Sequence, residues 1–263
     1  MSTAANAKPT IIIIPGAFSP LAMYDPVIAS LQAHGYTVHG VELESVGGRA
    51  KGHAAPAGMY DDAAKAAALA ARLADEGAEV VLVAHSYGGV VASEAAKGLA
   101  RSVRTREGKK GGIVRIVFVA AVVPREGETS KDVLGNPPPV EYVGLEDGHL
   151  SITDPVKGAP IIFSDLPLDE AVSWTTKFST HSPVSFGQKV TYAAYKDIPI
   201  SYVLCENNVL ITPAQQEKII AALEGEMGGE TVDRHPVQCG HGINVSQPGT
   251  MVDVIRRILG DTE

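Results

Sequence analysis

The ten residues VVLVAHSYGG, at positions 80–89, decide the fold because they place a serine between an apolar run and a stretch that favours a helix. A serine on a sharp strand-to-helix turn needs small residues two positions before and two after it, since the neighbouring backbones crowd together there. Ala84 and Gly88 meet that demand on either side of Ser86. Such a turn lifts the hydroxyl above the edge of a sheet and aims the first N–H groups of the helix at the group it attacks. We interpret this stretch as a nucleophile elbow rather than as a helix that Ser86 merely caps.

Strand-like and helix-like segments alternate along most of the chain, which predicts a mostly parallel, doubly wound α/β sheet with helices on both faces. We expect further strands at residues 11–14, 36–43, 113–123, 200–204 and 231–236, and helices at 24–34, 61–76, 90–96, 213–223 and 251–259. The alternation fails after Glu126, apart from a helical piece near residues 168–178. We therefore expect one domain spanning residues 1–263, with a cap at 126–190 inserted after the strand that ends near Val123.

Composition limits the class of partner. The formal net charge of −8 and the pI near 5.5 argue against nucleic acid and against an anionic membrane surface, which both select for a basic face. The one basic run, residues 101–110, is expected to be a solvated loop. No stretch reaches the ~18 consecutive apolar residues of a membrane span, and residues 1–10 lack the apolar core of a signal peptide. These features predict a soluble, cytoplasmic protein that acts on a small molecule.

A serine hydroxyl needs a base to take its proton, and histidine is the usual one. Of the eight histidines, only His241 lies in a loop between the last predicted strand and the last helix. Gly240 and Gly242 flank it and let that loop bend over the elbow. His241 is therefore the predicted base. His181 falls in the predicted cap, which faces the pocket, and is kept as a candidate substrate contact.

With these residues in place, the chain resembles the α/β-hydrolase superfamily, and within it the compact branch of plant methylesterases and hydroxynitrile lyases with their fungal and bacterial relatives. The resemblance runs from Ile11 to about Leu259, and the motifs that carry it are PGAF at 15–18, AHSYGG at 84–89, YVLCENN at 202–208, Gly240-His241 and SQP at 246–248. It implies an α/β-hydrolase fold. It also implies an oxyanion hole made by the backbone N–H groups of Ala17 and Tyr87, which fits the large catalytic contribution of preorganised donors.

The third member of the expected triad departs from the family pattern. Where relatives carry an aspartate, three residues after the strand end, this chain has Asn208. Glu206, two residues earlier, lies on the same side if the strand continues, and its longer side chain supplies a carboxylate. Asn208 alone orients His241 in the second alternative, as an asparagine does in papain-like proteases. The third alternative is Glu126, after the preceding strand, where some relatives place the acid, or no third member at all.

Aromatic side chains in the cap and near the elbow, including Phe18 and Trp174, indicate a small or medium, largely uncharged acyl substrate. The leading hypothesis is a serine hydrolase that cleaves an ester or lactone through an acyl-enzyme on Ser86. The alternatives are a lyase or cyclase that uses His241 as acid and base without an acyl-enzyme, and a non-catalytic ligand receptor. Nothing in the sequence calls for a metal or another cofactor, since the two cysteines lack metal-ligand spacing and no phosphate-binding glycine motif is present. No feature specifies an oligomeric state.

Overall fold

The computed structural model describes residues 8–48, 56–135 and 140–261. Its centre is a six-stranded sheet in which every neighbouring pair runs parallel. In spatial order the strands are β2 (Val38–Gly40), β1 (Thr10–Ile14), β3 (Glu79–His85), β4 (Gly112–Val119), β7 (Ile200–Cys205) and β8 (Asp233–Val237). The predicted α/β-hydrolase fold with a parallel sheet is confirmed.

The central strands are apolar throughout because both faces of the sheet are covered. In β1, Ile11 and Ile13 belong to the core on one face, whereas Ile12 and Ile14 belong to the core on the other. Each of these four side chains is fully buried. A strand that is buried on both faces reads as a continuous apolar run, which is why residues 11–14 and 80–83 were recognisable in the sequence.

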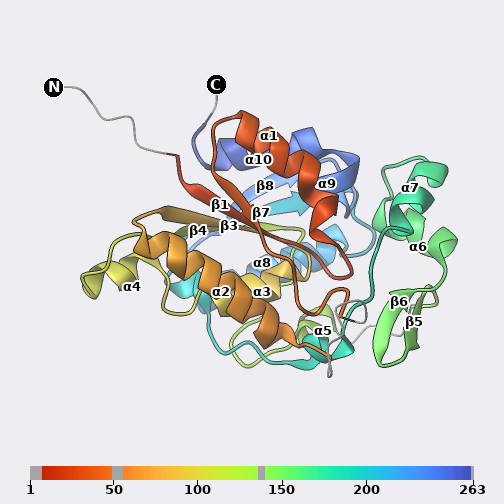
Figure 1. Ribbon diagram of the computed structural model, residues 1–263, viewed down its shortest axis with the longest axis horizontal. Helices are drawn as coiled ribbons and strands as arrows, with labels where there is room; N and C mark the ends of the chain where they lie inside the picture. Colours follow the sequence, from red (N-terminus) through yellow and green to blue (C-terminus); the bar gives the residue numbers. More distant parts are fainter. Residues whose placement is uncertain (1–7, 49–55, 136–139, 262–263) are drawn as a thin grey trace.

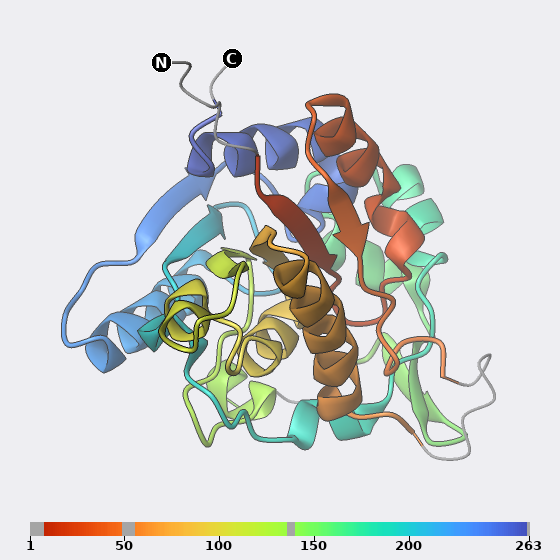
Figure 2. The same ribbon diagram turned by 60° about the vertical axis from the view of Figure 1, so that its left-hand side comes forward.

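Helices cover the two faces, as Figures 1 and 2 show. One face carries α1 (Asp25–Ala33) and α10 (Pro248–Ile258), with the short η1 (Leu21–Tyr24) and α9 (Ile243–Ser246) at one end. The other carries α2 (Met59–Asp75), α3 (Gly88–Ala95) and α8 (Pro213–Glu226). Within the described ranges, no helix is both long enough and apolar enough to cross a bilayer.

The basic run at 101–110, expected to be a loop, contains the helix α4 (Arg101–Arg106). Arg104 is 4% exposed, and its guanidinium donates to the Asp75 carboxylate at 2.6 Å and to the carbonyl oxygens of Lys110 and Gly111. These partners hold the turn in helical form. The expectation was wrong because one of these partners, Asp75, lies at the end of α2, far away in the sequence.

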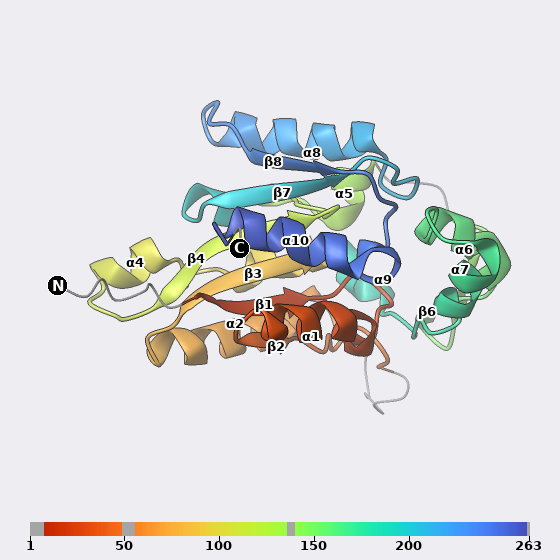
Figure 3. The same ribbon diagram turned by 90° about the horizontal axis from the view of Figure 1, so that it is seen from above.

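The chain between β4 and β7 supplies the segments that stand beyond one end of the sheet. They are α5 (Ser130–Leu134), the antiparallel hairpin β5 (Val143–Glu146) and β6 (His149–Ile152), α6 (Pro155–Ile162), α7 (Leu168–Thr175) and η2 (Pro183–Gly187). The short η3 (Ala194–Lys196) instead contacts α3 and leads into the first residue of β7. Figure 3 shows α6, α7 and β6 set apart from the sheet at that end. The hairpin has no counterpart among the predicted elements.

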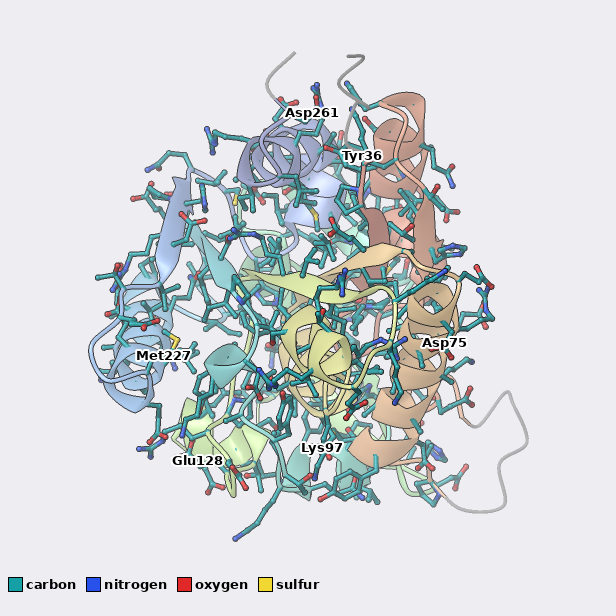
Figure 4. All side chains as sticks on the ribbon, turned by 90° about the vertical axis from the view of Figure 1, so that its left-hand side faces the viewer. Tyr36, Asp75, Lys97, Glu128, Met227 and Asp261 are labelled. Carbon is teal, nitrogen blue, oxygen red and sulfur yellow. The ribbon has the colours of Figure 1, made fainter. Side chains whose placement is uncertain are left out.

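The opposite end of the sheet holds the first and last described residues, Lys8 and Asp261. Tyr36 donates a hydrogen bond to the Asp261 carboxylate at 3.0 Å, and Lys8 forms an ion pair with the same carboxylate at 2.5 Å. Figure 4 shows Tyr36 and Asp261 close together. The carboxyl ends of the parallel strands therefore remain free to assemble a site with the loops that follow them, where open α/β sheets bind ligands.

Candidate active site

Ser86 stands at the end of β3, one residue after the strand and two before α3. Its φ of 54° lies in the left-handed region, which a non-glycine residue adopts at a cost. A Cβ on Gly88 would lie 2.4 Å from the carbonyl oxygen of Ile14, and one on Gly89 would lie 2.5 Å from that of Val122. Both glycines are thus required because neighbouring backbone approaches them closely. This crowding is the feature that the small residues around Ser86 indicated in the sequence.

His241 meets Ser86 across the carboxyl edge of the sheet. Its Nε2 lies 3.0 Å from the Ser86 Oγ. A Cβ on Gly240 would lie 2.6 Å from the Asp165 Oδ1, and one on Gly242 would lie 2.3 Å from the Phe163 ring. Asp165 also accepts a hydrogen bond from the Gly240 N–H at 2.9 Å. The flanking glycines therefore serve to let the segment after α6 pack closely on the His241 loop.

Asn208 is the residue that contacts the far side of the imidazole. Its Nδ2 lies 3.0 Å from the His241 Nδ1. Its Oδ1 accepts hydrogen bonds from the backbone N–H groups of Leu210 at 3.0 Å and Ile211 at 2.9 Å. The side chain is only 1% exposed. A buried amide, held at three points, therefore occupies the place where the family pattern has a carboxylate.

The two carboxylates considered for this place lie elsewhere. Glu206 is exposed and accepts a hydrogen bond from the Gln238 amide, and Glu126 is also exposed. β7 ends at Cys205, and the Asn208 N–H donates back to the Cys205 carbonyl at 3.3 Å. Because the chain turns there, the strand alternation that was expected to direct Glu206 toward His241 no longer applies. The structure corrects that expectation in favour of Asn208.

Burial keeps the imidazole neutral. His241 is 4% exposed, and desolvation holds the pKa of its ring well below the usual 6.5, with a further lowering from the neighbouring His85. The two rings are tilted, with centroids 4.9 Å apart. At neutral pH the ring is therefore uncharged and can take up a proton during the reaction.

A second histidine joins three active-site loops. The Gly16 N–H donates to the Tyr24 hydroxyl at 3.0 Å, and that hydroxyl lies 2.7 Å from the His85 Nδ1. The His85 Nε2 lies 2.9 Å from the carbonyl oxygen of His241. A carbonyl only accepts, so His85 donates from Nε2 and accepts the Tyr24 proton at Nδ1. Burial lowers the pKa of His85 to about 4, which keeps it in this neutral form.

A cavity of about 300 Å³ lies against this assembly, with Ser86 and His241 in its wall. Apolar side chains from the elbow region and from the segment between β4 and β7 form most of the lining, among them Met23, Tyr142, Ile152, Phe163, Phe178 and Phe186. No Lys, Arg, Asp or Glu is present among its described lining residues. The site therefore presents the Ser86 hydroxyl and the His241 imidazole to a mostly apolar, uncharged space.

Comparison with known proteins agrees with this geometry, since residues 11–254 match the model of the alpha/beta hydrolase family. The chain belongs to that family. It is 33% identical over 253 residues to "Probable hydrolase R7" of Phoma sp., covering 96% of this chain and 99% of the relative. A pyrethroid hydrolase from Sphingobium faniae superposes with a TM-score of 0.73 at 22% identity, covering 96% and 97% of the two chains. Tomato methylketone synthase I superposes with a TM-score of 0.71 at 14% identity, covering 97% and 99%.

Among the side chains of this hydrolase expected to contact substrate, Phe18 lines the cavity, whereas Trp174 and His181 do not. The Trp174 ring, in α7, is covered by the Lys177 ammonium at 3.5 Å from its centroid. His181 is fully buried and accepts the Phe18 N–H at Nδ1 (3.3 Å), and its Nε2 lies 2.8 Å from the Ser185 hydroxyl. Burial lowers the pKa of His181 to about 3. His181 thus holds the loop that carries Phe18.

Ala17 and Tyr87 line the same cavity as Ser86. Across the described part of the chain, no hydrogen bond to a protein acceptor is formed by the backbone N–H of either residue. These two N–H groups are thus available to a ligand oxygen at the cavity wall.

The two cysteines of the hydrolase, Cys205 and Cys239, are buried free thiols. A hydrogen bond with Cys239, together with burial, holds the pKa of Cys205 well above its usual value, so it remains a thiol. Within residues 8–48, 56–135 and 140–261, no group of three histidine, cysteine or acidic side chains is arranged to hold a metal ion.

Proposed function

We propose that the protein is a serine hydrolase that cleaves a small or medium, largely uncharged ester or lactone through an acyl-enzyme on Ser86. The observation that carries the proposal is the 3.0 Å contact between the Ser86 Oγ and the His241 Nε2 in the wall of an apolar cavity. A nucleophile within hydrogen-bond reach of its base is the arrangement that acyl transfer requires. The hydrolase name of the 33% identical relative supports the same class.

In the proposed reaction, the Ser86 oxygen attacks the carbonyl carbon while His241 takes the hydroxyl proton. The backbone N–H groups of Ala17 and Tyr87 receive the oxyanion of the tetrahedral intermediate. His241 then returns the proton to the leaving alcohol as the C–O bond breaks. His241 then takes a proton from water, whose oxygen attacks the acyl carbon, and passes that proton to the Ser86 oxygen as its bond to the acyl group breaks.

The lining supports the proposed class of substrate. A cavity without charged side chains cannot compensate the desolvation of a charged ligand, so an uncharged acyl compound is favoured. Its volume, about 300 Å³, lies at the lower end of the range for ligand pockets. The net charge of −8 also favours a small molecule over nucleic acid as the partner.

A fluorophosphonate probe tests the nucleophile. We expect covalent label on Ser86, loss of label and of ester hydrolysis in Ser86→Ala, and loss of hydrolysis in His241→Ala. Ser102→Ala, in α4, is the matched control and should behave as wild type. Absence of label on Ser86, or undiminished hydrolysis by Ser86→Ala, overturns the proposal.

A second candidate is a lyase or cyclase in which His241 acts as acid and base without an acyl-enzyme. The buried amide of Asn208 favours it, because an amide cannot stabilise the imidazolium formed during acyl transfer as a carboxylate does. Turnover that persists in Ser86→Ala and disappears in His241→Ala would establish this alternative.

A further inference from the structure

The orientation of the Asn208 amide is fixed by its backbone partners. Its oxygen accepts two N–H groups, those of Leu210 and Ile211, within 3.0 Å. If the amide were turned over, its NH₂ would face two donors and both hydrogen bonds would be lost in a buried site. The nitrogen end therefore faces His241.

This orientation determines where the imidazole carries its proton. The Asn208 Nδ2 can only donate, so the His241 Nδ1, 3.0 Å away, must accept with its lone pair. A neutral imidazole that accepts at Nδ1 carries its hydrogen on Nε2. That nitrogen lies 3.0 Å from the Ser86 Oγ, so in this state the ring donates to the serine oxygen.

We propose that Asn208 holds resting His241 in the Nε2–H tautomer, so that the site rests as a hydrogen-bond donor toward the cavity and Ser86 is activated only in the minor tautomer. Attack by Ser86 requires a free lone pair on Nε2 to receive the hydroxyl proton, and the resting ring lacks it. This inference rests on the proposed hydrolase function for its kinetic consequence. Its statement about the proton stands on the contacts of Asn208 alone.

The substitution Asn208→Asp replaces the hydrogen-bond donor that faces the His241 Nδ1 by an acceptor and keeps the other two hydrogen bonds. A carboxylate accepts from Leu210 and Ile211 as the amide oxygen does, and its second oxygen accepts from the His241 Nδ1–H. The proton then moves from Nε2 to Nδ1, and Nε2 gains the lone pair that receives the Ser86 proton. In a serine protease, replacement of the triad aspartate by asparagine gives the wrong tautomer and lowers kcat by about 10⁴-fold. We expect ester hydrolysis to rise by about 10²–10⁴-fold.

The position of the proton on His241 is the first measurement that tests this inference, and the rate of ester hydrolysis is the second. In protein carrying ¹⁵N-labelled histidine, with the His241 signals identified by their absence in His241→Gln, we expect the proton on Nε2 in wild type and on Nδ1 in Asn208→Asp. Asn207→Asp is the matched control, because it adds the same charge one residue away at an exposed position, and it should leave both the tautomer and the rate unchanged. A proton on Nδ1 in the wild-type protein overturns the inference, whether or not Asn208→Asp folds.

The kinetic outcome separates this inference from the proposed function. A folded Asn208→Asp variant that is no faster than Asn207→Asp, although its proton has moved to Nδ1, overturns the claim that the tautomer limits the rate. If neither wild type nor Asn208→Asp takes up a fluorophosphonate on Ser86 while the tautomers are as expected, the hydrolase function fails and the assignment of the proton stands.

Discussion

Removing the hydroxyl of Tyr24 should weaken both the fold and the active site. In Tyr24→Phe, the Gly16 N–H loses its acceptor and the His85 Nδ1 loses its donor, at a position that is fully buried. The same hydroxyl links the loop that begins at Gly16 with the ring that supports the His241 backbone. The loss should therefore appear in both stability and turnover.

The magnitude follows from the two groups left without partners. Each buried group that loses its partner costs about 1–3 kcal/mol, so two give about 2–6 kcal/mol. Domains of ordinary stability unfold with about 5–15 kcal/mol, so Tyr24→Phe should remain folded at 25 °C in most of this range. At about 2–4 °C per kcal/mol for a chain of this size, a loss of about 3 kcal/mol lowers Tm by about 6–12 °C.

Urea unfolding measures the free energy of unfolding of Tyr24→Phe and of the matched control, Tyr60→Phe. The Tyr60 hydroxyl also donates to a carbonyl, that of Lys189 at 2.7 Å, but the residue is 41% exposed and water can replace the lost partner. The control should lose no more than about 0.5 kcal/mol. If Tyr24→Phe is no less stable than Tyr60→Phe, then the buried network does not stabilise the protein and the reasoning is refuted.

Three further outcomes follow from the site and its supports. Phe18→Ala should raise KM for an apolar ester more than fivefold, whereas Trp174→Ala should leave KM within about twofold, because Phe18 lines the cavity and Trp174 does not. Equal effects of the two substitutions in steady-state kinetics would contradict this. Gly88→Ala should destabilise by at least about 2 kcal/mol in urea because its Cβ meets strand carbonyls, whereas Gly225→Ala, in open space on α8, should stabilise by about 0.5–1 kcal/mol; the opposite order would refute the packing argument. Burial lowers the pKa of His181 to about 3, so below pH 6.5 the unfolded chain binds more protons than the folded chain. The urea concentration at the unfolding midpoint should therefore decrease as the pH is lowered from 6.5 to 5. A midpoint that stays constant over this range contradicts the assignment.

The parts of the molecule that the sequence revealed are those with local causes. The apolar run at 11–14 is a strand because both faces of the sheet are covered, and the small residues around Ser86 mark the crowded turn. The predicted strand at 36–43 is shorter, Val38–Gly40, and the predicted helix at 61–76 is Met59–Asp75. Local patterns therefore identified these elements and left their ends uncertain by a few residues.

The parts that the sequence did not reveal depend on distant contacts. Tyr24 is separated from His85 by 61 positions, and nothing near either residue announces the hydrogen bond between them. Asn208 reaches His241 because the chain turns immediately after Cys205, an event that strand alternation does not predict. The identity of the partner of His241 thus required the course of the loop after β7.

The most direct test of the central claim is to trap the acyl group. Wild-type protein mixed briefly with an aryl ester of a short fatty acid, quenched in acid and digested, should yield the peptide that contains Ser86 with the mass of the acyl group added, and Ser86→Ala should yield none. If the ester is cleaved with no adduct on Ser86, and Ser86→Ala cleaves it equally fast, the hydrolase mechanism proposed for this protein is wrong.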